Sequence, residues 1–555
     1  MLGNLVVNGV YFFSDLERAN ALNDYFATSF SKPSNHPIFQ QTGPPIIFTE
    51  GNLEDALARL NSNSSPGPDK IPMFFWVNIR KTIGPHLLKL FNIFINSGFV
   101  PLEWRKALVF PLYKNTGKPY ELSSYRPISL CCSLSKIFEK MLLLLIQDDI
   151  ERRALISDSQ HGFRKRHSTV TNLLLTYDYV LECLDRNQPV DVIYLDFSKA
   201  FDKISHELLL RKLFQLKFAP SIVNWISSFL TDRTQSVIIN GLASQPVSVP
   251  SGVPQGSLIG PLLFVLYLND LFNVRIKSKL IAYADDTKLF GAVSKDNNLS
   301  EDLAFIEQWC VQNAMELNVL KCAVLHFGHQ NPKFSYQLNG LSIPIVPYYK
   351  DLGVLVDSRF SFHEHISSVS KKCFVLARII SRSFTFKSPP FLAKIFKAYV
   401  LPLIMYALPF FQLRSVTNIN RLEDIQRKFT RSFFRNSTPR PEYLSRLALF
   451  DLQPVEILIV KRGLIFLYKS AHSPNPIASI LPDMFSSATI NTLCKFRSPA
   501  CKSELRKSSF PLNLIPIWNS LPAELTSAPT LIRFRHLLDS LDLSVHMKGR
   551  TLKTS

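Results

Sequence analysis

The sequence predicts an α+β protein in which strands and helices alternate to about residue 357 and a largely helical segment follows. Two patterns support this fold class. Short runs of β-branched and aromatic residues, such as 192–195, alternate with longer runs of helical periodicity before residue 357. After that point helical periodicity dominates, and basic residues outnumber acidic ones. With 555 residues, 46% of them apolar and 19% charged, the chain can build several cores, so about two to four domains are expected.

Periodicity and turn residues divide the part before residue 357 into a succession of elements. We first expect amphipathic helices at 12–32 and 50–62 joined by a Pro-rich linker at 31–45, and then a turn cluster at 64–72 with a helix to about 97. A strand and turn at 106–119, an apolar helix at 134–153 and a strand that changes to helix at about Asp196 follow. The last elements are a hairpin around Asn240 and Gly241, an apolar helix at 257–269, a hairpin at 279–290, a helix to about 316 and a strand at 321–328. Asn-Gly supplies the two positive-φ positions that a two-residue hairpin turn needs.

The formal net charge is +20 and the isoelectric point is near 9.5, which favours a polyanionic partner such as nucleic acid or an acidic membrane surface. The charge is concentrated, because no acidic residue lies between Glu364 and Glu423. The cations of this stretch are Lys371, Lys372, Arg378, Arg382, Lys387, Lys394, Lys397, Arg414 and Arg421. A solvated helix face normally mixes both signs, so we interpret the stretch as a nucleic-acid surface, with a basic helical cap as the alternative.

The eight cysteines include no Cys-x-x-Cys pair, so we expect reduced, mostly buried thiols rather than a zinc site or a disulfide frame. This cysteine usage favours an intracellular protein, in the nucleus or the cytoplasm. The N-terminus lacks the pattern of a secretory signal, and no other targeting signal is identified. The apolar stretches at 257–270 and 398–413 are too short to span a membrane, so no membrane partner is expected.

Two stretches place carboxylates where metal-dependent chemistry could occur. In KLIAYADDTKLF, Asp285 and Asp286 interrupt an apolar run, and in DVIYLDFSKAFD, Asp196 stands where a buried strand ends. A plain turn for the doublet and a helix N-cap for Asp196 are the alternatives, and Asp202 is interpreted as a charge on the face of the following helix. If the strands are neighbours, the three carboxylates could hold two Mg²⁺ ions about 4 Å apart, as phosphoryl transfer on a polynucleotide requires.

These stretches belong to an ordered series of motifs. YLDFSKAFD, SGVPQGSLIGPLLFVLYLND, IAYADDTKLF, LNVLKCAVLHFG and KDLGVLVD resemble, in order and spacing, the motifs of reverse transcriptases. Upstream, SSPGPDKIP, residues 104–142 and QHGFRKRHST are similar to the extended fingers of non-LTR (LINE-like) retrotransposon polymerases of the jockey kind. The resemblance covers roughly residues 60–360. It implies a right-hand polymerase with fingers, a palm built on an antiparallel sheet, and a thumb.

By this resemblance Asp196, Asp285 and Asp286 match the catalytic triad that holds two divalent ions, Mg²⁺ or alternatively Mn²⁺. Lys321 falls where such polymerases place a lysine that protonates pyrophosphate. Nucleotide-binding roles are implied for Lys114, Lys118, Arg126, Phe197, Phe201, Gln255 and Gly256. Phe201 matches the bulky position that blocks a ribonucleotide 2′-hydroxyl, with an ordinary core aromatic as the alternative. The turn at 351–354 resembles the one that grips the primer end.

The resemblance also implies an organisation of the whole chain. We expect an N-terminal helical extension at 1–60, fingers and palm at 61–357 with a core at about 95–357, a helical basic thumb at 358–445 and a mainly helical C-terminal region at 446–555. Nucleic-acid binding by the thumb is expected at Lys371, Lys372, Arg378, Arg382 and Lys387. Lys70 departs from the glycine of the family's PGPDG motif. We further expect the chain to lack the endonuclease that precedes the polymerase in related elements and to end as such reading frames end, so target nicking would come from elsewhere.

The implied function is template-directed addition of deoxynucleoside triphosphates to a primer 3′-hydroxyl, with RNA as template and DNA as primer or target. The alternative from a different class is a catalytically idle RNA-binding or maturase-like remnant of such an element. Intact carboxylates argue against it, because a pure binding role would not need them beside polyanionic RNA. A viral RNA-dependent RNA polymerase is disfavoured, since it usually has glycine before the doublet and a smaller residue at the position of Phe201.

Overall fold

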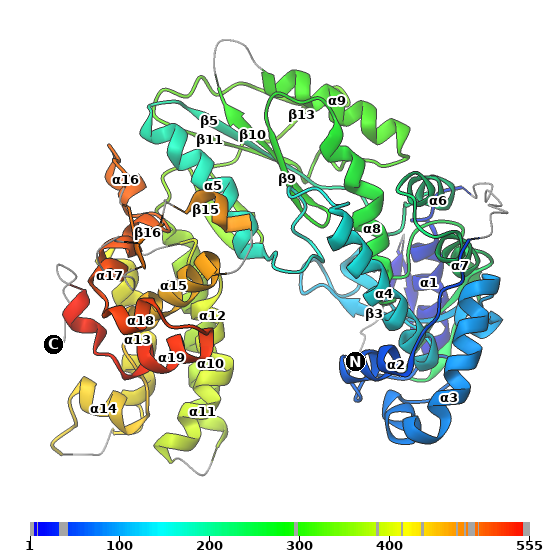
Figure 1. The fold of residues 1–555 in the computed structure, drawn as a ribbon, viewed down its shortest axis with the longest axis horizontal. Helices are drawn as coiled ribbons and strands as arrows, with labels where there is room; N and C mark the ends of the chain where they lie inside the picture. The colour runs from blue at the N-terminus through cyan, green and yellow to red at the C-terminus, as the bar shows by residue number, and fades with distance from the viewer. Residues whose placement is uncertain are drawn as a thin grey trace. The chain divides into compact units, whose positions relative to one another are not determined.

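The described residues of the computed structural model (Figure 1) are 5–7, 9–32, 43–293, 298–384, 388–411, 415–434, 438–472, 476–481, 484–486, 494–497 and 499–547. They form a mixed structure of helices and sheets, which confirms the predicted α+β class. The chain divides into two compact units. Unit 1 comprises Met1–Phe163, Asp196–Ile276 and Asp302–Asn318, and unit 2 comprises Arg164–Leu195, Lys277–Glu301 and Val319–Ser555.

The sheet of unit 1 joins two distant parts of the chain. β3 (Lys106–Tyr113) pairs antiparallel with β4 (Tyr125–Leu130) and parallel with β6 (Thr234–Ile239). β6 also pairs antiparallel with β7 (Leu242–Ala243) and β8 (Val247–Ser248). Asn240 and Gly241 connect β6 to β7 with φ of 48° and 87°, so the predicted Asn-Gly hairpin is confirmed.

Most of the remaining elements of unit 1 are helices. They are α1 (Asp15–Ala27), α2 (Glu50–Ala58), α3 (Met73–Ser97), α4 (Ser133–Arg153), α6 (His206–Gln215), α7 (Pro220–Leu230) and α8 (Gly260–Leu268). The hairpin of β1 (Leu5–Val7) and β2 (Val10–Phe12) precedes them. Helix α9 (Asn298–Gln312) begins in unit 2 and continues into unit 1. One boundary was predicted wrongly, because the helix expected from about Asp196 begins only at His206, where Ser205 caps it. The residues between them form turns that carry the YLDFSKAFD motif.

The N-terminal helix α1 is part of the packing of unit 1. Its buried Leu22 and Phe26 share a core with Val109 of β3 and Val237 of β6. A capping box between Ser14 and Glu17 starts the helix. The Asn23 side chain donates to the carbonyl of Gln245 at 2.8 Å and accepts from Gln235 Nε2 at 3.0 Å. α1 therefore covers β6, which a helix with one apolar face does when a sheet offers a matching face.

Unit 2 contains a four-stranded antiparallel sheet in the order β11-β5-β10-β9. The strands are β5 (Val190–Leu195), β9 (Lys279–Tyr283), β10 (Asp286–Ala292) and β11 (Ala323–Phe327), and α5 (Thr169–Asp185) lies against β5, β9 and β10. Every residue of β5 is buried, as the apolar run predicts for an interior strand. Two further hairpins, of β12 (Gln337–Leu338) with β13 (Leu341–Ser342) and of β14 (Tyr348–Asp351) with β15 (Val354–Asp357), follow.

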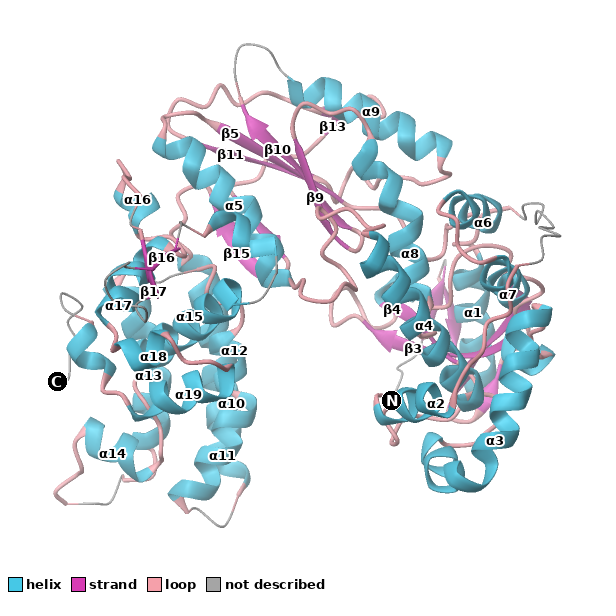
Figure 2. Cartoon of the chain, viewed as in Figure 1, coloured by secondary structure: helices cyan, strands magenta, loops and turns pink. Residues whose placement is uncertain are grey.

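Beyond β15 the described part of unit 2 is largely helical (Figure 2). Its elements are α10 (His363–Ser383), α11 (Pro389–Tyr399), α12 (Leu401–Met405), α13 (Val416–Arg431), α14 (Tyr443–Leu449), α15 (Val455–His472), α16 (Glu504–Lys507), α17 (Ile515–Ser520), α18 (Ala523–Thr526), α19 (Leu531–Ser540) and the strand pair β16 (Met484–Ser486) and β17 (Cys494–Phe496). One hydrophobic core runs from α5 through these helices to Met547. The C-terminal region therefore shares one hydrophobic core with α5 and the four-stranded sheet of unit 2.

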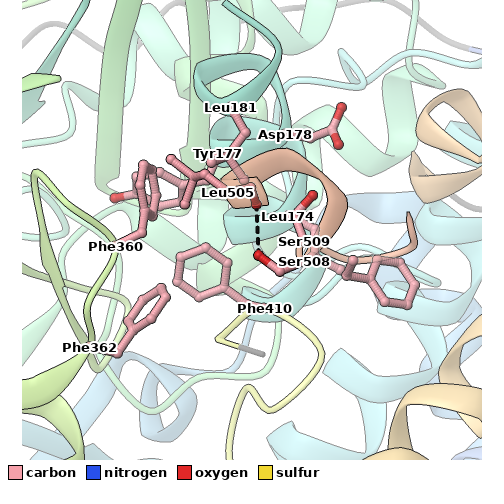
Figure 3. A pocket seen from close by; sticks show the side chains of 11 residues that line it. Leu174, Tyr177, Asp178, Leu181, Phe360, Phe362, Phe410, Leu505, Ser508 and Ser509 are labelled. Atoms are coloured by element: carbon pink, nitrogen blue, oxygen red, sulfur yellow. Dashed lines mark hydrogen bonds between the residues drawn. The ribbon is translucent and has the colours of Figure 1, made fainter. Parts of the chain in front are cut away.

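The contact between α5 and the C-terminal region surrounds a small pocket (Figure 3). Leu174, Tyr177 and Leu181 of α5 face Phe360, Phe362 and Phe410 and the segment 505–510 across it. The Arg506 guanidinium donates to the carboxylate of Asp178 at 2.5 Å, and both side chains are largely buried. The backbone N–H of Ser503 donates to Asp185 at 2.6 Å. Both contacts connect the C-terminal region to α5, and removing one partner of the Asp178–Arg506 pair would leave the other charge buried.

Burial of His365, near the start of α10, predicts an acid-sensitive unit 2. Burial, followed by the charges of Lys372 and Lys350, lowers the pKa of His365 from 6.5 to about 4. As the pH falls below about 6.5, His365 becomes protonated in the unfolded chain. In the folded chain His365 stays neutral until the pH reaches about 4. The free energy of unfolding should therefore drop over this window, by about 3 kcal/mol in total. Thermal unfolding across this pH range should show a smaller loss in His365→Gln, and an equal loss would contradict the assignment.

The remaining sequence predictions for the fold concern cysteines and membrane spans. Cys131, Cys132, Cys183, Cys310, Cys322 and Cys373 are free and buried, and Cys501 is free and partly exposed. The expectation of reduced, mostly buried thiols holds for these described side chains. No helix within the described residues is long and apolar enough to cross a membrane.

Candidate active site

The doublet of Asp285 and Asp286 lies at a hairpin tip in unit 2, as predicted. Asp286, the first residue of β10, pairs with Tyr283, the last residue of β9, so the turn consists of Ala284 and Asp285. Ala284 adopts a φ of 57°, the left-handed conformation that a tight two-residue turn requires. The Asp285 side chain is half-buried and that of Asp286 is exposed. The turn interpretation is therefore correct, and the hairpin leaves one carboxylate half-buried and the other exposed.

Three strand ends meet at the same edge of this sheet. Leu195, the last residue of β5, pairs with Thr287 of β10, and Tyr194 pairs with Ala323, the first residue of β11. Asp196 follows Leu195 directly in the chain, and its carbonyl accepts from the N–H of Asn318 at 2.8 Å within unit 1. The exposed Lys321 lies in the turn two residues before β11. The edge that ends β5 thus also carries the doublet and the turn of Lys321.

A buried ion pair lies within the same unit, close in sequence to the doublet. Lys288 and Asp351 are 2% and 4% exposed at their side chains, and Lys288 Nζ lies 2.9 Å from Asp351 Oδ2. The Tyr177 hydroxyl donates to the same Asp351 oxygen at 2.8 Å and lies 2.7 Å from the hydroxyl of Tyr194. These four side chains connect β10, β5, α5 and the β14–β15 hairpin. The turn of that hairpin is the DLGV sequence at 351–354.

Burial lowers the pKa of Lys288, and the Asp351 carboxylate acts in the opposite direction. The one signal of this pair in the sequence is a lysine inside the short strand 287–290. Its partner lies 63 residues away and depends on the packing of the β14–β15 hairpin. The DLGV turn was predicted by resemblance alone, with no partner for Asp351.

In unit 1, the SGVPQGS loop is packed against the turn that follows Asp196. The N–H of Val253 donates to the Phe201 carbonyl at 2.9 Å, and the N–H of Gly252 donates to the Ile204 carbonyl at 2.8 Å. Gly252 has a φ of 81°, and a Cβ there would lie 2.6 Å from the Phe201 carbonyl oxygen. Gly256 has a φ of 147°, and its Cβ would lie 2.1 Å from the carbonyl oxygen of Ser129. Both glycines therefore permit a close backbone approach that no other residue allows.

Two residues predicted for this region have defined partners. The ring of Phe201 stacks on Phe264 of α8 with 4.4 Å between centroids. Gln255 Nε2 donates to Asp202 Oδ1 at 2.8 Å, and the Gln255 carbonyl accepts from the N–H of Ser129 at 2.9 Å. The interpretation of Asp202 as a helix-face charge is wrong, because Asp202 precedes α6 and bonds to Gln255. Burial raises the pKa of Asp202, while the Gln255 hydrogen bond and the charges of Lys199 and Lys114 oppose that rise.

The other predicted nucleotide-binding residues lie on or beside the strands of unit 1. Lys114 directly follows β3, is exposed, and donates to the carbonyl of Ser123 at 2.7 Å. Lys118 is exposed in the turn before β4, 3.8 Å from Glu121, and Arg126 is exposed on β4. Phe197 differs from these, because its ring is 4% exposed and packs against Trp309 in the core. Its ring therefore does not face an open site, and a nucleotide contact would have to come from its backbone.

The predicted thumb cations lie on α10. Lys371, Lys372, Arg378 and Arg382 are exposed on this helix, whose opposite face carries the buried Ile366, Cys373, Ala377 and Ile380. Lys387 lies outside the described residues. Lys70, where the family carries glycine, adopts a φ of 56°, so it keeps the left-handed conformation that glycine would take there.

Comparison with known families accounts for this combination of motifs. The model of the family described as reverse transcriptase (RNA-dependent DNA polymerase) matches residues 113–369. Residues 113–369 thus have the sequence pattern of a reverse transcriptase domain. The matched range contains the Asp285-Asp286 hairpin, the SGVPQGS loop and the β14–β15 hairpin, and it ends within α10.

The curated proteins that this chain resembles come from mobile elements. The chain is 28% identical over 410 residues to the RNA-directed DNA polymerase from mobile element jockey of Drosophila melanogaster, covering 71% of this chain and 44% of that protein. It is 28% identical over 413 residues to the probable RNA-directed DNA polymerase from transposon BS of the same species, covering 70% and 44%. A third relative, from transposon X-element, is 26% identical over 466 residues, covering 78% and 51%. The chain spans about half the length of the curated relatives it matches.

Proposed function

We propose that this chain is an RNA-directed DNA polymerase of a non-LTR retrotransposon, which copies an RNA template by adding deoxynucleotides to a DNA primer 3′-hydroxyl. The observation that carries the proposal is the pairing of β10 with β5. This pairing sets the turn of Asp285 and Asp286 beside the strand end that Asp196 follows in the chain. The curated relatives whose names state this activity support the same conclusion.

The acidic residues have the chemistry that divalent cations require. Asp285 and Asp286 offer carboxylate oxygens that are at least partly exposed, and Mg²⁺ is usually held by one or two carboxylates together with substrate phosphates. No group of three His, Cys, Asp or Glu side chains within the described residues could hold a metal ion by itself. In this proposal Asp285 and Asp196 are the principal ligands and Asp286 is a supporting one, as the resemblance implies, and substrate phosphates would supply further ligands. Two such ions, Mg²⁺ or Mn²⁺, would supply charge stabilisation for an in-line displacement.

The residues of unit 1 would position the incoming deoxynucleotide in this proposal. Lys114 and Arg126 would bind its triphosphate, an assignment that their exposure supports. Gln255 would lie beside the template and the nucleotide, with Asp202 holding its amide in one orientation. In right-hand terms, the sheet of unit 1 would belong to the fingers, the four-stranded sheet of unit 2 to the palm, and α10 with its cations to the thumb. Lys321 would donate a proton to the departing pyrophosphate.

A primer-extension assay tests the proposal directly. The purified chain would be given a primed RNA template, deoxynucleoside triphosphates and Mg²⁺ or Mn²⁺, and product length would be followed on gels. We expect extension that depends on the RNA template and stops when the divalent ion is chelated. If the chain binds the primed RNA but extends it under none of these conditions, the catalytically idle remnant is the correct description.

The stacking of Phe201 on Phe264 yields a prediction about sugar selection. A ring held in place by a neighbour leaves no room for an extra 2′-oxygen if the sugar lies over it. Phe201→Val should raise ribonucleotide incorporation relative to deoxynucleotide incorporation by roughly tenfold or more, since a contact of about 1–3 kcal/mol is removed. Single-nucleotide extension with matched ribo- and deoxynucleotides measures the ratio. An unchanged ratio, with deoxynucleotide addition retained, would identify Phe201 as an ordinary core aromatic.

A further inference from the structure

The buried carboxylate of Glu139, on α4, has no part in the chemistry described so far. Its side chain is inaccessible to solvent, and its Oε2 accepts from the N–H of Leu258 at 2.7 Å and more weakly from that of Ile259 at 3.4 Å. Its Oε1 accepts from the hydroxyl of Ser135 at 3.0 Å. Leu258 and Ile259 join the SGVPQGS loop to α8, so a carboxylate from α4 binds the junction of the loop and the helix.

The start of α8 depends on this carboxylate because it lies inside the protein. Ile259 occupies the N-cap position, and its apolar side chain cannot accept a hydrogen bond. The N–H of Gly260 donates to the hydroxyl of Ser257 at 3.1 Å. The N–H groups of Leu258 and Ile259 remain, and Glu139 accepts from both. Water has little access here, since Ile259 and Gly260 are buried, and a buried N–H without an acceptor is unfavourable.

A second contact fixes the same loop just before this junction. The Gln255 carbonyl accepts from the N–H of Ser129 on β4 at 2.9 Å, and Gly256 lies too close to the Ser129 carbonyl for any Cβ. In the chain, α4 follows shortly after β4. The segment 125–153 therefore supports the loop at Ser129 and at Glu139, on both sides of the exposed Gly256.

An ordinary role as a helix cap accounts for only part of this arrangement. A helix is usually capped by a Ser, Thr, Asp or Asn beside it in the sequence, whereas this acceptor lies 119 residues from Leu258. Burial raises the pKa of Glu139, and the hydrogen bonds from Leu258 and Ser135 oppose that rise. Burying a carboxyl group is unfavourable unless hydrogen bonds satisfy it. Glu139 therefore favours the one position of the loop that satisfies its oxygens.

We propose that Glu139 is a positioning residue of the polymerase, which holds the SGVPQGS loop so that Gln255 and Gly256 take up one geometry beside the incoming deoxynucleotide and its template base. The inference rests on the proposed function, in which this loop contacts the nucleotide. Glu139 does not touch substrate itself and acts through the backbone of Leu258 and Ile259. A misplacement of about 1 Å can slow a reaction by roughly a hundredfold, so a loosened loop should be visible in the kinetics.

Two substitutions of Glu139 test the role of its hydrogen bonds. Glu139→Met has a similar length but no strong acceptor, whereas Glu139→Gln keeps an acceptor oxygen and can donate to Ser135. With the active fraction determined by titration, we expect Glu139→Met to raise the KM for deoxynucleotide by roughly tenfold or more and to leave the affinity for primed RNA unchanged. Glu139→Gln should restore most of the wild-type KM. An unchanged KM in Glu139→Met, or an equal rise in both variants, would overturn the proposal.

Glu423 of α13 offers a matched control in unit 2. Its buried carboxylate also accepts from a backbone N–H at 2.7 Å, that of Val455 at the start of α15. Glu423→Met should therefore lower the temperature of thermal unfolding, as Glu139→Met does, but leave the KM for deoxynucleotide at the wild-type value. The same rise in KM in both methionine variants would mean that lost stability explains the effect, and the proposal would be wrong.

Hydrogen exchange separates this inference from the proposed function, because it needs no substrate. Backbone amides at 252–260 should exchange faster in Glu139→Met than in wild type, while those of β3 should not change. If wild type extends no primer, the proposed function fails, and the exchange result still decides whether Glu139 fixes the loop. Equal exchange at 252–260 in the two proteins would contradict the role of Glu139 whatever the activity.

Discussion

Replacing Asp285 by asparagine is expected to slow primer extension by at least roughly a hundredfold, the scale on which loss of one charge-stabilising group slows an enzyme. Asparagine has the same shape, and Asp285 occupies a two-residue turn in which asparagine is well tolerated. The change therefore removes a negative charge and leaves the hairpin intact. Single-turnover extension on a primed RNA template measures the rate, and titration of labelled RNA checks that binding is retained.

The control for this variant is another aspartate of the same chain. Asp55 is exposed on α2, so Asp55→Asn removes one charge at a position with no proposed part in catalysis. Its extension rate should equal that of wild type. Equal rates for wild type and Asp285→Asn, with template-dependent extension in both, would remove Asp285 from the active site. Loss of RNA binding in Asp285→Asn would instead point to a structural role for the turn.

The second large effect is expected at the buried pair of Lys288 and Asp351. Asp351→Ala leaves the Lys288 ammonium buried without its carboxylate and deprives the Tyr177 hydroxyl of its acceptor. Breaking a buried pair in this way should lower the free energy of unfolding by about 3–5 kcal/mol. Because the pair connects β10 to the β14–β15 hairpin, unit 2 should lose most of this stability. Denaturant unfolding followed by tryptophan fluorescence measures the change.

A double replacement distinguishes the ion pair from simple loss of volume. Lys288→Met with Asp351→Leu removes both charges while keeping the site filled, and such replacements of buried pairs are often neutral. We expect the double variant to be more stable than Asp351→Ala alone. If the single variant unfolds like wild type, the pair is not a stabilising contact of the folded chain. If the double variant is no more stable than the single one, the Tyr177 hydrogen bond accounts for the loss instead.

Much of the local structure was predictable because it is encoded within short windows. The Asn240-Gly241 turn and the tip at Asp285 were correctly expected from turn chemistry, and the buried strand β5 from its apolar run. The start of the helix expected at Asp196 was wrong by ten residues. The helical sequence pattern begins earlier than Ser205, which is the residue that caps the helix. The interpretation of Asp202 was wrong for the same reason. Asp202 was assigned to the exposed face of that helix, which in fact begins after it.

The sequence by itself determined which elements form and which residue types could carry chemistry: a carboxylate doublet at a turn, an aspartate after a buried strand, and a basic chain around them. Only the tertiary structure decided their partners. It paired β10 with β5, brought Gln255 into contact with Asp202, and enclosed Lys288 with Asp351. The physical reason is that periodicity and turn propensity act over a few residues, whereas these pairings arise from burial of surfaces far apart in the chain.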